Sequence, residues 1–180
     1  MRKLGLILAV EATRNLKTNE DTVITPLEVK AQCSYVNDNR ILLVPILRAG
    51  IGFVDSFLEM LPSARVGHIG LYRDHETLEA CTYLDTVPEQ DNGFEKILVL
   101  DPMLATGNSS VKALEIIVSK GYAPRDITLV CAFAVNQGIA QVKEKFPDIQ
   151  IVTAVIDPEL NDKSYIVPGL GDAGDRFYLL

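Results

Sequence analysis

From residue 41 onward, mainly apolar runs alternate with segments in which apolar residues recur at helical spacing. Each run predicts a buried strand, and the runs cover residues 41–48, 64–72, 97–101, 127–135 and 149–157. The helical patterns cover residues 52–61, 109–121 and 136–147. Strands that are apolar on both sides are typical of a parallel sheet with helices on both faces. We therefore expect an α/β protein with a doubly wound, mainly parallel sheet that binds its ligands at the carboxyl ends of the strands.

The first residues allow two interpretations. Residues 4–10 form an apolar run after two basic residues, as in a secretory signal peptide. However, the run only reaches the minimum length of about 7 residues for such a segment, Glu11 follows at once, and no convincing cleavage site is present. The spacing of Leu4, Ile7 and Leu8 fits a short amphipathic helix, which is the interpretation we adopt. No apolar run approaches the ~18 residues of a membrane span.

Two segments depart from the alternation of strands and helices. Residues 72–95 are polar and long for a connection between strands, which indicates a functional or flexible arm with room for a short hairpin. Near the C-terminus, Gly169, Gly171 and Gly174 predict turns with positive φ or a close approach of the backbone to a ligand. No internal repeat is apparent, so we expect residues 1–180 to form a single domain.

Composition narrows the classes of function. The net charge of −7 argues against a protein that binds nucleic acid or an anionic membrane, since both require a basic surface. Cys33, Cys81 and Cys131 are widely spaced and odd in number, which fits reduced thiols in a cytoplasm better than disulfides or a zinc site. No Ser-His-Asp, Cys-His or metal-ligand constellation is evident in the sequence, so no protein-bound metal is expected.

The stretch DPMLATGNSS, residues 101–110, follows a predicted strand and begins a predicted helix. The first turn of a helix attracts anions, and the small residues at 105–107 would let a phosphate reach the backbone. Asp101, at the carboxyl end of the strand, could accept hydrogen bonds from sugar hydroxyls. The stretch is not a Walker A loop, because the Gly-Lys-Ser/Thr ending is missing. On local sequence alone, a capped helix start with Asn108 or Ser109 as the N-cap is slightly favoured.

Other candidate residues are ambiguous when each is taken alone. Arg48 ends a buried strand in the sequence Leu-Arg-Ala-Gly and could bind an anion, but an Arg that solvates the strand end or pairs with an acid is about equally plausible. Arg73 lies in the long polar segment, where most arginines are simply solvated. Asp172 and Asp175 could be turn formers among the glycines. Together these features describe an anion-binding sheet edge with acids for sugar hydroxyls, which fits phosphoribosyl or nucleotide chemistry.

Four stretches together resemble uracil phosphoribosyltransferase, a family of type I phosphoribosyltransferases. They read VPILRAG, YRDHETLE, LDPMLATGNSS and YIVPGLGDAGDR, and they occur in the order and at the spacing of that family. The resemblance covers residues 9–178 and includes EATRNL near the start. The loop after Asp101 resembles the phosphoribosyl pyrophosphate (PRPP) loop of type I enzymes in general. The C-terminal stretch is more specific, because it resembles the segment that reads uracil.

The resemblance implies a pentosyltransferase of pyrimidine salvage that converts uracil and PRPP into UMP and pyrophosphate. Arg48 and Arg73 match pyrophosphate-contacting arginines, the second on a flexible arm that closes over the substrate. Mg²⁺ is expected to arrive on PRPP, and a cytoplasmic homodimer or higher homo-oligomer is the family expectation. The implied catalytic residues are Arg73 and Asp172; the implied PRPP-binding residues are Arg48, Arg73, Asp101, Pro102, Met103, Leu104, Ala105, Thr106, Gly107, Asn108, Ser109 and Asp172; and the implied uracil-binding residues are Ile166, Gly171, Asp172 and Ala173.

The sequence also departs from the family pattern. Most of the residues that usually precede EAT are missing, Asn108 stands where the family has a second glycine, and residues 80–86 replace a segment that usually carries Pro, Tyr, Phe and Lys. These departures leave an alternative open, a non-catalytic member of the fold that binds uracil, UMP or PRPP as a sensor or partner subunit. Catalysis requires Arg73 and the arm to close, whereas sensing requires only the PRPP loop and the C-terminal segment.

Overall fold

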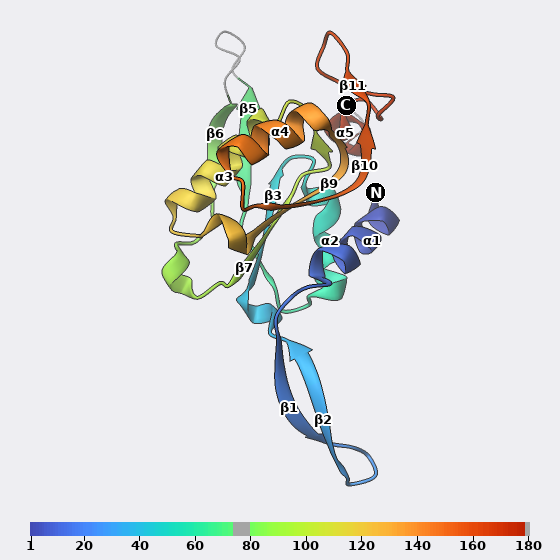
Figure 1. Ribbon diagram of the computed structural model, residues 1–180, viewed down its shortest axis with the longest axis vertical. Coiled ribbons are helices and arrows are strands. Elements are labelled where there is room, and N and C mark those ends of the chain that lie inside the picture. Colours follow the sequence, from blue (N-terminus) through green and yellow to red (C-terminus); the bar gives the residue numbers. More distant parts are fainter. Residues whose placement is uncertain (74–79, 179–180) are drawn as a thin grey trace.

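The computed structural model describes residues 1–73 and 80–178 (Figure 1). The helices are α1 (Arg2–Thr13), α2 (Ile51–Met60), α3 (Asn108–Ser119), α4 (Asn136–Lys145) and α5 (Ala173–Tyr178). The central sheet contains β3 (Ile41–Leu47), β4 (Arg65–Val66), β5 (Ile69–Arg73), β6 (Ala80–Asp85), β7 (Lys96–Leu100), β8 (Met103–Leu104), β9 (Ile127–Val135) and β10 (Gln150–Asp157). Two small sheets pair β1 (Thr18–Ile24) with β2 (Lys30–Val36) and β11 (Glu159–Leu160) with β12 (Ile166–Val167). No helix in these residues is long and apolar enough to cross a membrane.

The central sheet has the strand order β10-β9-β7-β3-β5-β6, with β4 beside β3 and β8 beside β9. Each neighbouring pair is parallel except β5 with β6, which is antiparallel. The prediction of an α/β fold with a mainly parallel sheet is thus confirmed. Because β3, β7 and β9 run in the same direction, their carboxyl ends meet at one edge of the sheet, which we call the carboxyl edge.

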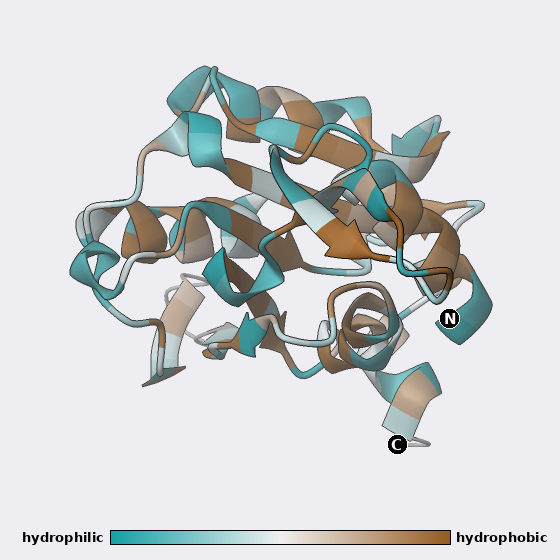
Figure 2. Ribbon diagram, turned by 90° about the horizontal axis from the view of Figure 1, so that it is seen from below, coloured by the Kyte–Doolittle hydropathy of each residue, from teal (hydrophilic) through white to brown (hydrophobic). Residues whose placement is uncertain are grey.

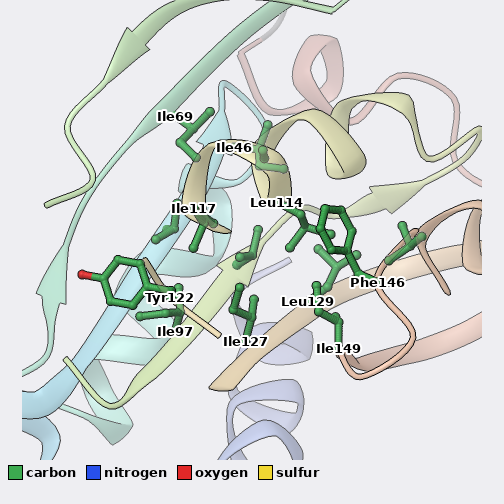
Figure 3. Close-up of a cluster of buried hydrophobic side chains, with 14 of the residues drawn as sticks. Ile46, Ile69, Ile97, Leu114, Ile117, Tyr122, Ile127, Leu129, Phe146 and Ile149 are labelled. Atoms are coloured by element: carbon green, nitrogen blue, oxygen red, sulfur yellow. The ribbon is translucent and has the colours of Figure 1, made fainter. Parts of the chain in front are cut away.

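Successive residues of the central strands feed two separate cores, because side chains in a strand point alternately to its two faces. In β7, Ile97 and Val99 belong to one core, whereas Leu98 and Leu100 belong to the other. Figure 3 shows the first core, in which Leu114 of α3 lies among the strand side chains. Helices α3 and α4 cover this face, and α1 and α2 cover the opposite face. In Figure 2 the central strands are brown and the helices are mixed in colour, as expected of amphipathic helices.

The predicted run at 127–135 coincides with β9, and the amphipathic helix predicted at the start is α1. A single strand over 64–72 is wrong, because the chain forms β4 and β5 with Gly67 and His68 between them. These two residues bond to different partners. The main-chain N–H of Gly67 donates to Leu43 O at 2.9 Å, and that of His68 donates to Thr86 Oγ1 at 2.8 Å. The local hydrogen bonds therefore divide the predicted strand into two at Gly67 and His68.

Strand β10 differs from the prediction of a strand buried on both faces. It lies at the edge of the sheet with β9 as its one neighbour in the sheet order. Val155 is 42% exposed and Ile156 is 53% exposed. The apolar run marks a strand correctly, but its position at the edge leaves the carboxyl half of the strand partly uncovered.

The β1–β2 hairpin has no counterpart in the sequence prediction. It projects away from the body of the molecule (Figure 1), and every residue of β1 is exposed. Its turn is closed by the main-chain N–H of Thr25, which donates to Val29 O at 3.0 Å, and Glu28 has a φ of 59°. A strand that packs on no core needs no alternation of apolar and polar residues, so the periodicity that reveals buried strands is absent here.

Candidate active site

A cavity of about 420 Å³ lies at the carboxyl edge of the sheet, where the fold class places ligands. Its walls come from the residues after β3 and β7, from the start of α3, from the loop between β11 and β12, and from the C-terminal segment. They comprise Ile46, Leu47, Arg48, Ala49, Leu71, Asp101, Met103, Ala105, Thr106, Gly107, Asn108, Ser109, Ser110, Lys163, Ser164, Tyr165, Asp172 and Gly174. Segments that are far apart in the sequence therefore share one cavity.

The PRPP loop, residues 101–109, connects β7 to α3 and is supported by α4. A Cβ atom on Gly138 would lie 2.3 Å from Ala105 O, so only glycine allows this close approach of the α4 backbone. The amide of Gln141, one turn further along α4, donates from Nε2 to Oδ1 of Asn108 at 2.6 Å. The loop conformation is thus fixed by a helix that follows it by some thirty residues in the chain.

The start of α3 differs from the expected cap. Gly107, with a φ of 91°, is the N-cap residue, and no side chain hydrogen-bonds to the cap. The prediction of Asn108 or Ser109 as the N-cap is therefore wrong, since both already lie within the helix. The N–H groups of a first helical turn have no partners within the helix. Because residues 107–110 line the cavity, these donors are placed to meet an anion there.

Asp101 follows β7 directly and is 9% exposed. Burial raises the pKa of its carboxyl group to about 7, and the main-chain N–H of Met103, which donates to Oδ1 at 3.4 Å, opposes that increase. A carboxyl group with this pKa is present in both protonation states near neutral pH. Its oxygens can accept hydrogen bonds from hydroxyl groups of a ligand in the cavity.

Arg48 is placed by the turn between β3 and α2. Its guanidinium carbon lies 5.9 Å from the centroid of the Tyr178 ring, and its main-chain oxygen accepts a hydrogen bond from the Tyr178 hydroxyl at 3.1 Å. In the described part of the chain Arg48 forms no ion pair with an acid, so its charge is not neutralised there. Pairing of Arg48 with an acid is therefore not seen among the described residues, and Arg48 is one of the residues that line the cavity.

The C-terminal segment contributes Asp172 to the same cavity. Its Oδ1 accepts a hydrogen bond from the main-chain N–H of Asp175 at 2.9 Å at the start of α5. A second cavity of about 490 Å³ lies beside this segment and is lined by Ile166 and Gly171 as well as Asp172. Asp172 and Tyr165 line both cavities, so the two spaces adjoin.

Some of the expected site residues line the two cavities and others do not. Nearly all the residues of the PRPP loop line the first cavity, but Pro102 and Leu104 are buried beneath its wall. Ala173 is 3% exposed and lines neither of the two cavities just described. Arg73 is the last residue of β5, where its backbone pairs with Ala80, and its side chain lies outside what the structure describes, as do residues 74–79.

Among the wall residues that were not expected from the sequence, Lys163, Ser164 and Tyr165 form one loop. Asn161 organises their loop, because its Oδ1 accepts hydrogen bonds from the main-chain N–H groups of Lys163 and Tyr165 at 3.0 Å each. Ser164 has a φ of 63°. An Asn that begins a polar tetrapeptide is a typical signal of an Asx turn, and that signal marks this loop in the sequence.

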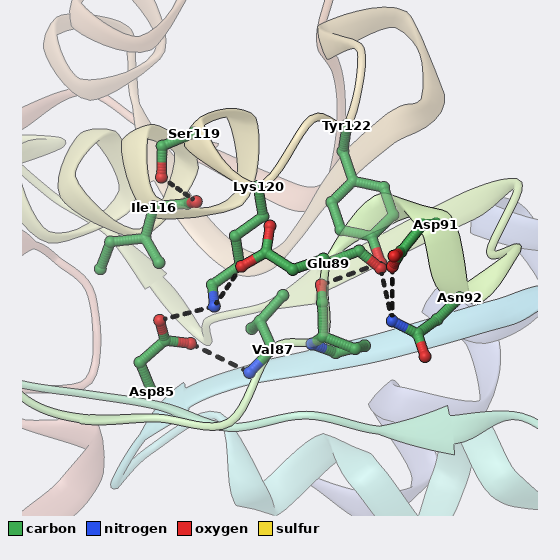
Figure 4. A network of polar contacts seen from close by, with 10 residues as sticks. Asp85, Val87, Glu89, Asp91, Asn92, Ile116, Ser119, Lys120 and Tyr122 are labelled. Atoms are coloured by element: carbon green, nitrogen blue, oxygen red, sulfur yellow. Dashed lines mark hydrogen bonds and ion pairs between the residues drawn. The ribbon is translucent and has the colours of Figure 1, made fainter.

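The arm that carries Arg73 is a hairpin of β5 and β6, as the sequence suggested for part of residues 72–95. A polar network anchors its base (Figure 4). Lys120 Nζ lies 3.0 Å from Asp85 Oδ2 and 3.7 Å from Glu89 Oε1, and the Tyr122 hydroxyl donates to Pro88 O at 3.1 Å. These contacts connect the end of β6 to the end of α3, whose first turn lines the cavity.

Known proteins resemble this chain over nearly its full length. The family model for uracil phosphoribosyltransferase matches residues 1–179. Proteins of that name from Clostridium kluyveri and Thermosipho africanus are 46% and 48% identical, and the alignments cover 99% of this chain and 83% and 84% of theirs. A solved protein from Aquifex aeolicus superposes with a TM-score of 0.89 at 38% identity, covering 99% of this chain and 84% of that one.

More distant solved structures support the fold alone. A hypoxanthine phosphoribosyltransferase from Staphylococcus aureus has a TM-score of 0.57 at 11% identity and covers 98% of this chain and 88% of that one. The likeness agrees with a type I phosphoribosyltransferase fold around the carboxyl-edge cavity. The family itself follows from the match over residues 1–179 and from the 46% and 48% identical relatives, and the chain belongs to the uracil phosphoribosyltransferase family.

Proposed function

We propose that this enzyme transfers the phosphoribosyl group of PRPP to uracil, giving UMP and pyrophosphate. The observation that carries the proposal is the convergence of Arg48, the PRPP loop and Asp172 on one cavity. An unpaired guanidinium, free helix N–H groups and two carboxyl groups are the chemical types that a phosphorylated sugar needs. Family membership then selects uracil as the acceptor.

PRPP would be held at three points. Its 5′-phosphate would accept hydrogen bonds from the main-chain N–H groups and hydroxyls of residues 105–109, which include Thr106 and Ser109. Asp101 would accept hydrogen bonds from the ribose hydroxyls. Arg48 would contact the pyrophosphate, and Arg73 would add a second guanidinium when the arm closes.

Uracil would be read by the C-terminal segment. We assign this role to Ile166 and to residues 171–173, whose main-chain N–H and C=O groups can match the donors and acceptors of the base. The second cavity adjoins the PRPP cavity at Asp172, so a base held there lies beside the ribose. Cytosine would present the opposite pattern at two positions, and each unpaired buried polar group costs about 1–3 kcal/mol.

In the reaction, the bond between C1′ and the pyrophosphate oxygen breaks and the bond between N1 of uracil and C1′ forms. The electron pair of the broken bond leaves with pyrophosphate, and positive charge develops on the ribose. The Arg48 and Arg73 guanidinium groups stabilise the departing anion, and the Asp172 carboxylate stabilises the ribose cation. N1 of uracil gives up its proton, which the departing pyrophosphate or solvent takes up, as the product forms. Closure of the arm excludes water that would otherwise hydrolyse PRPP.

The donor atoms of the cavity fit a Mg²⁺ ion that arrives on PRPP. Asp101 and Asp172 supply carboxylates to the cavity, yet the described residues contain no group of three or more His, Cys, Asp or Glu that could hold a metal by themselves. Phosphate and ribose oxygens would therefore supply most ligands, as is usual for Mg²⁺ at nucleotide sites. Bound in this way, Mg²⁺ would neutralise charge on the departing pyrophosphate.

The proposed assembly is a homodimer built on the β1–β2 hairpin. The hairpin projects from the body (Figure 1) and exposes apolar side chains, of which Ile24 is 63% and Val29 60% exposed. Exposed apolar surface of this kind marks an interaction site, and a second copy would cover both hairpins at once. Ile24→Asp should convert the dimer to monomer in sedimentation velocity, whereas Thr18→Asp at the hairpin base should not. A dimer that survives Ile24→Asp would contradict the assignment.

The free thiols of Cys33, Cys81 and Cys131 support a cytoplasmic location. Buried Cys131 would stay reduced most readily, since burial raises the pKa of its thiol and so suppresses the reactive thiolate.

The test of function is UMP formation from radiolabelled uracil and PRPP with Mg²⁺. Arg73→Ala should reduce turnover by at least tenfold while the affinity for UMP, measured by calorimetry, changes little. Arg125→Ala is the matched control, because Arg125 is exposed on a 3₁₀ turn away from the cavity. Clear binding of UMP by a wild-type protein without turnover would favour the sensor alternative. Equal losses of turnover and UMP affinity in Arg73→Ala would contradict the role given to Arg73.

A further inference from the structure

Helix α5 contacts the Arg48 turn through two consecutive aromatic residues. The Tyr178 hydroxyl donates to Arg48 O at 3.1 Å, and the Arg48 guanidinium carbon lies 5.9 Å from the centroid of the same ring. The neighbouring ring of Phe177 packs against Gly52, where a Cβ atom would lie 3.0 Å from the ring. One side chain, Tyr178, therefore holds both the main chain and the charged group of Arg48.

The same short helix begins at the segment to which uracil recognition is assigned. Asp172 lines both cavities and hydrogen-bonds to the first turn of α5, and Tyr178 is the last residue of that helix. In Figure 1, α5 lies near the end of β10, at the carboxyl edge of the sheet. A single helical segment, Ala173–Tyr178, thus joins the proposed base site to the turn that carries Arg48.

We propose that Tyr178 is a positioning residue for PRPP, which holds Arg48 in the orientation that receives the pyrophosphate. The inference rests on the proposed function and adds a residue that no part of the PRPP or uracil motif contains. An arginine side chain loses conformational entropy when it is ordered. A guanidinium that already rests on an aromatic ring has lost part of that freedom before PRPP arrives.

Tyr178 is suited to a mutational test because it contributes little to the core. Its side chain is 40% exposed, and it belongs to neither buried cluster. Tyr178→Phe removes the hydrogen bond to Arg48 O but keeps the ring beneath the guanidinium. Tyr178→Leu removes both interactions. Tyr35→Phe is the control for loss of a tyrosine hydroxyl, because Tyr35 is exposed on the hairpin.

The experiment measures the KM for PRPP, the KM for uracil, kcat and Tm of the wild type and these variants. We expect the KM for PRPP to increase about threefold in Tyr178→Phe and about tenfold or more in Tyr178→Leu. The KM for uracil and kcat should stay within about twofold, and Tm should be unchanged. Calorimetry with Mg²⁺-pyrophosphate, in the absence of uracil, should show the same order of affinities.

The outcomes separate this inference from the proposed function. A wild type that forms no UMP would refute the function itself, whereas the pyrophosphate affinities would still report on Tyr178 and Arg48. An active wild type whose Tyr178 variants keep the PRPP KM and pyrophosphate affinity would overturn the inference. So would equal increases in both KM values together with a lower Tm, because that result would mean that α5 only supports the fold.

Discussion

The main-chain oxygen of Ala105 lies so close to Gly138 that no side chain fits between them. A Cβ atom on Gly138 would be 2.3 Å from Ala105 O and 2.9 Å from Leu104 O. Both oxygens belong to the PRPP loop, and backbone atoms cannot move aside as the end of a flexible side chain can. The position of α4 therefore determines the conformation of the loop that we propose binds the 5′-phosphate, although α4 itself contributes no residue to the cavity.

Gly138→Ala should consequently displace the PRPP loop. We expect a loss of about 1–3 kcal/mol in the free energy of unfolding, as for overpacked sites in general. The KM for PRPP should increase by about tenfold or more, with a smaller effect on the KM for uracil. Steady-state kinetics and urea denaturation check both expectations. Gln137→Ala, an exposed change in the same helical turn, is the control and should have neither effect.

The buried carboxyl group of Asp101 should make stability depend on pH. Its pKa is about 7 in the folded state and near 3.8 when exposed, so the folded state binds the proton more tightly. The favourable contribution is complete below about pH 4 and is lost as the pH rises through 7. The amide of Asp101→Asn does not titrate, so this variant does not lose stability in the same way as the pH rises. Its free energy of unfolding relative to the wild type should therefore increase between pH 4 and 8 by roughly a few kcal/mol.

Urea denaturation of both proteins at several pH values measures this difference, and the subtraction cancels the titration of all other groups. A difference that does not change with pH would show that the Asp101 carboxyl group is ionised already at pH 4 in the folded protein. PRPP affinity of Asp101→Asn should also be lower, since an amide offers one acceptor oxygen to the ribose where the carboxylate offers two.

The anchor of the arm can be tested at Lys120. Its side chain is 18% exposed and contacts Asp85, which is 29% exposed, at 3.0 Å. Lys120→Met should lower the free energy of unfolding by about 1 kcal/mol, because a partly buried pair is screened less than a surface pair. Lys112→Met is the control, since Lys112 pairs with Glu115 at 3.8 Å with greater exposure and should cost less than about 0.5 kcal/mol. Equal effects in urea denaturation at low ionic strength would contradict the anchoring role.

Asn108 occupies a position where the family pattern has glycine, and its amide oxygen is engaged by Gln141 at 2.6 Å. Asn108→Gly should therefore leave the KM for PRPP within about threefold, because a main-chain N–H toward the phosphate is retained. It should lower the free energy of unfolding by about 1 kcal/mol through helix propensity and the lost hydrogen bond. Gln141→Ala should lower the free energy of unfolding only by the share that comes from the lost hydrogen bond. A large increase in the PRPP KM of Asn108→Gly would show that the side chain itself binds substrate.

Buried elements were the most predictable part of the fold. The strand at 127–135 was located correctly because its side chains enter two cores, so both faces select apolar residues. The end of α3 was also predicted, since Gly121 has the φ of 96° that its position requires. The β1–β2 hairpin was missed because every residue of β1 is exposed and β2 reaches a core only at its end, through Val36, so no buried apolar run marks the hairpin.

The residues of the candidate site were likewise predictable only where a local sequence pattern marks them. The PRPP loop stands out because a buried strand stops at an acid and small residues follow. Gln141 and Gly138 could not be assigned to the site, because their role depends on α4 lying against the loop in space. Lys163 is in a similar position, since it reaches the cavity through a turn organised by Asn161. The predicted N-cap of α3 was wrong for a local reason, because Gly107, with a positive φ, takes the cap position in place of a residue with a capping side chain.

The β1–β2 hairpin is also a suitable site for a fluorescent label. Leu27, in its turn, is 84% exposed, and the hairpin points away from the carboxyl edge of the sheet (Figure 1). In a variant in which Cys33 and Cys81 are replaced by serine, a fluorophore attached through a cysteine introduced at this position would lie far from the carboxyl-edge cavity. Its energy transfer between labelled chains would follow their association while the catalytic cavity remained chemically untouched.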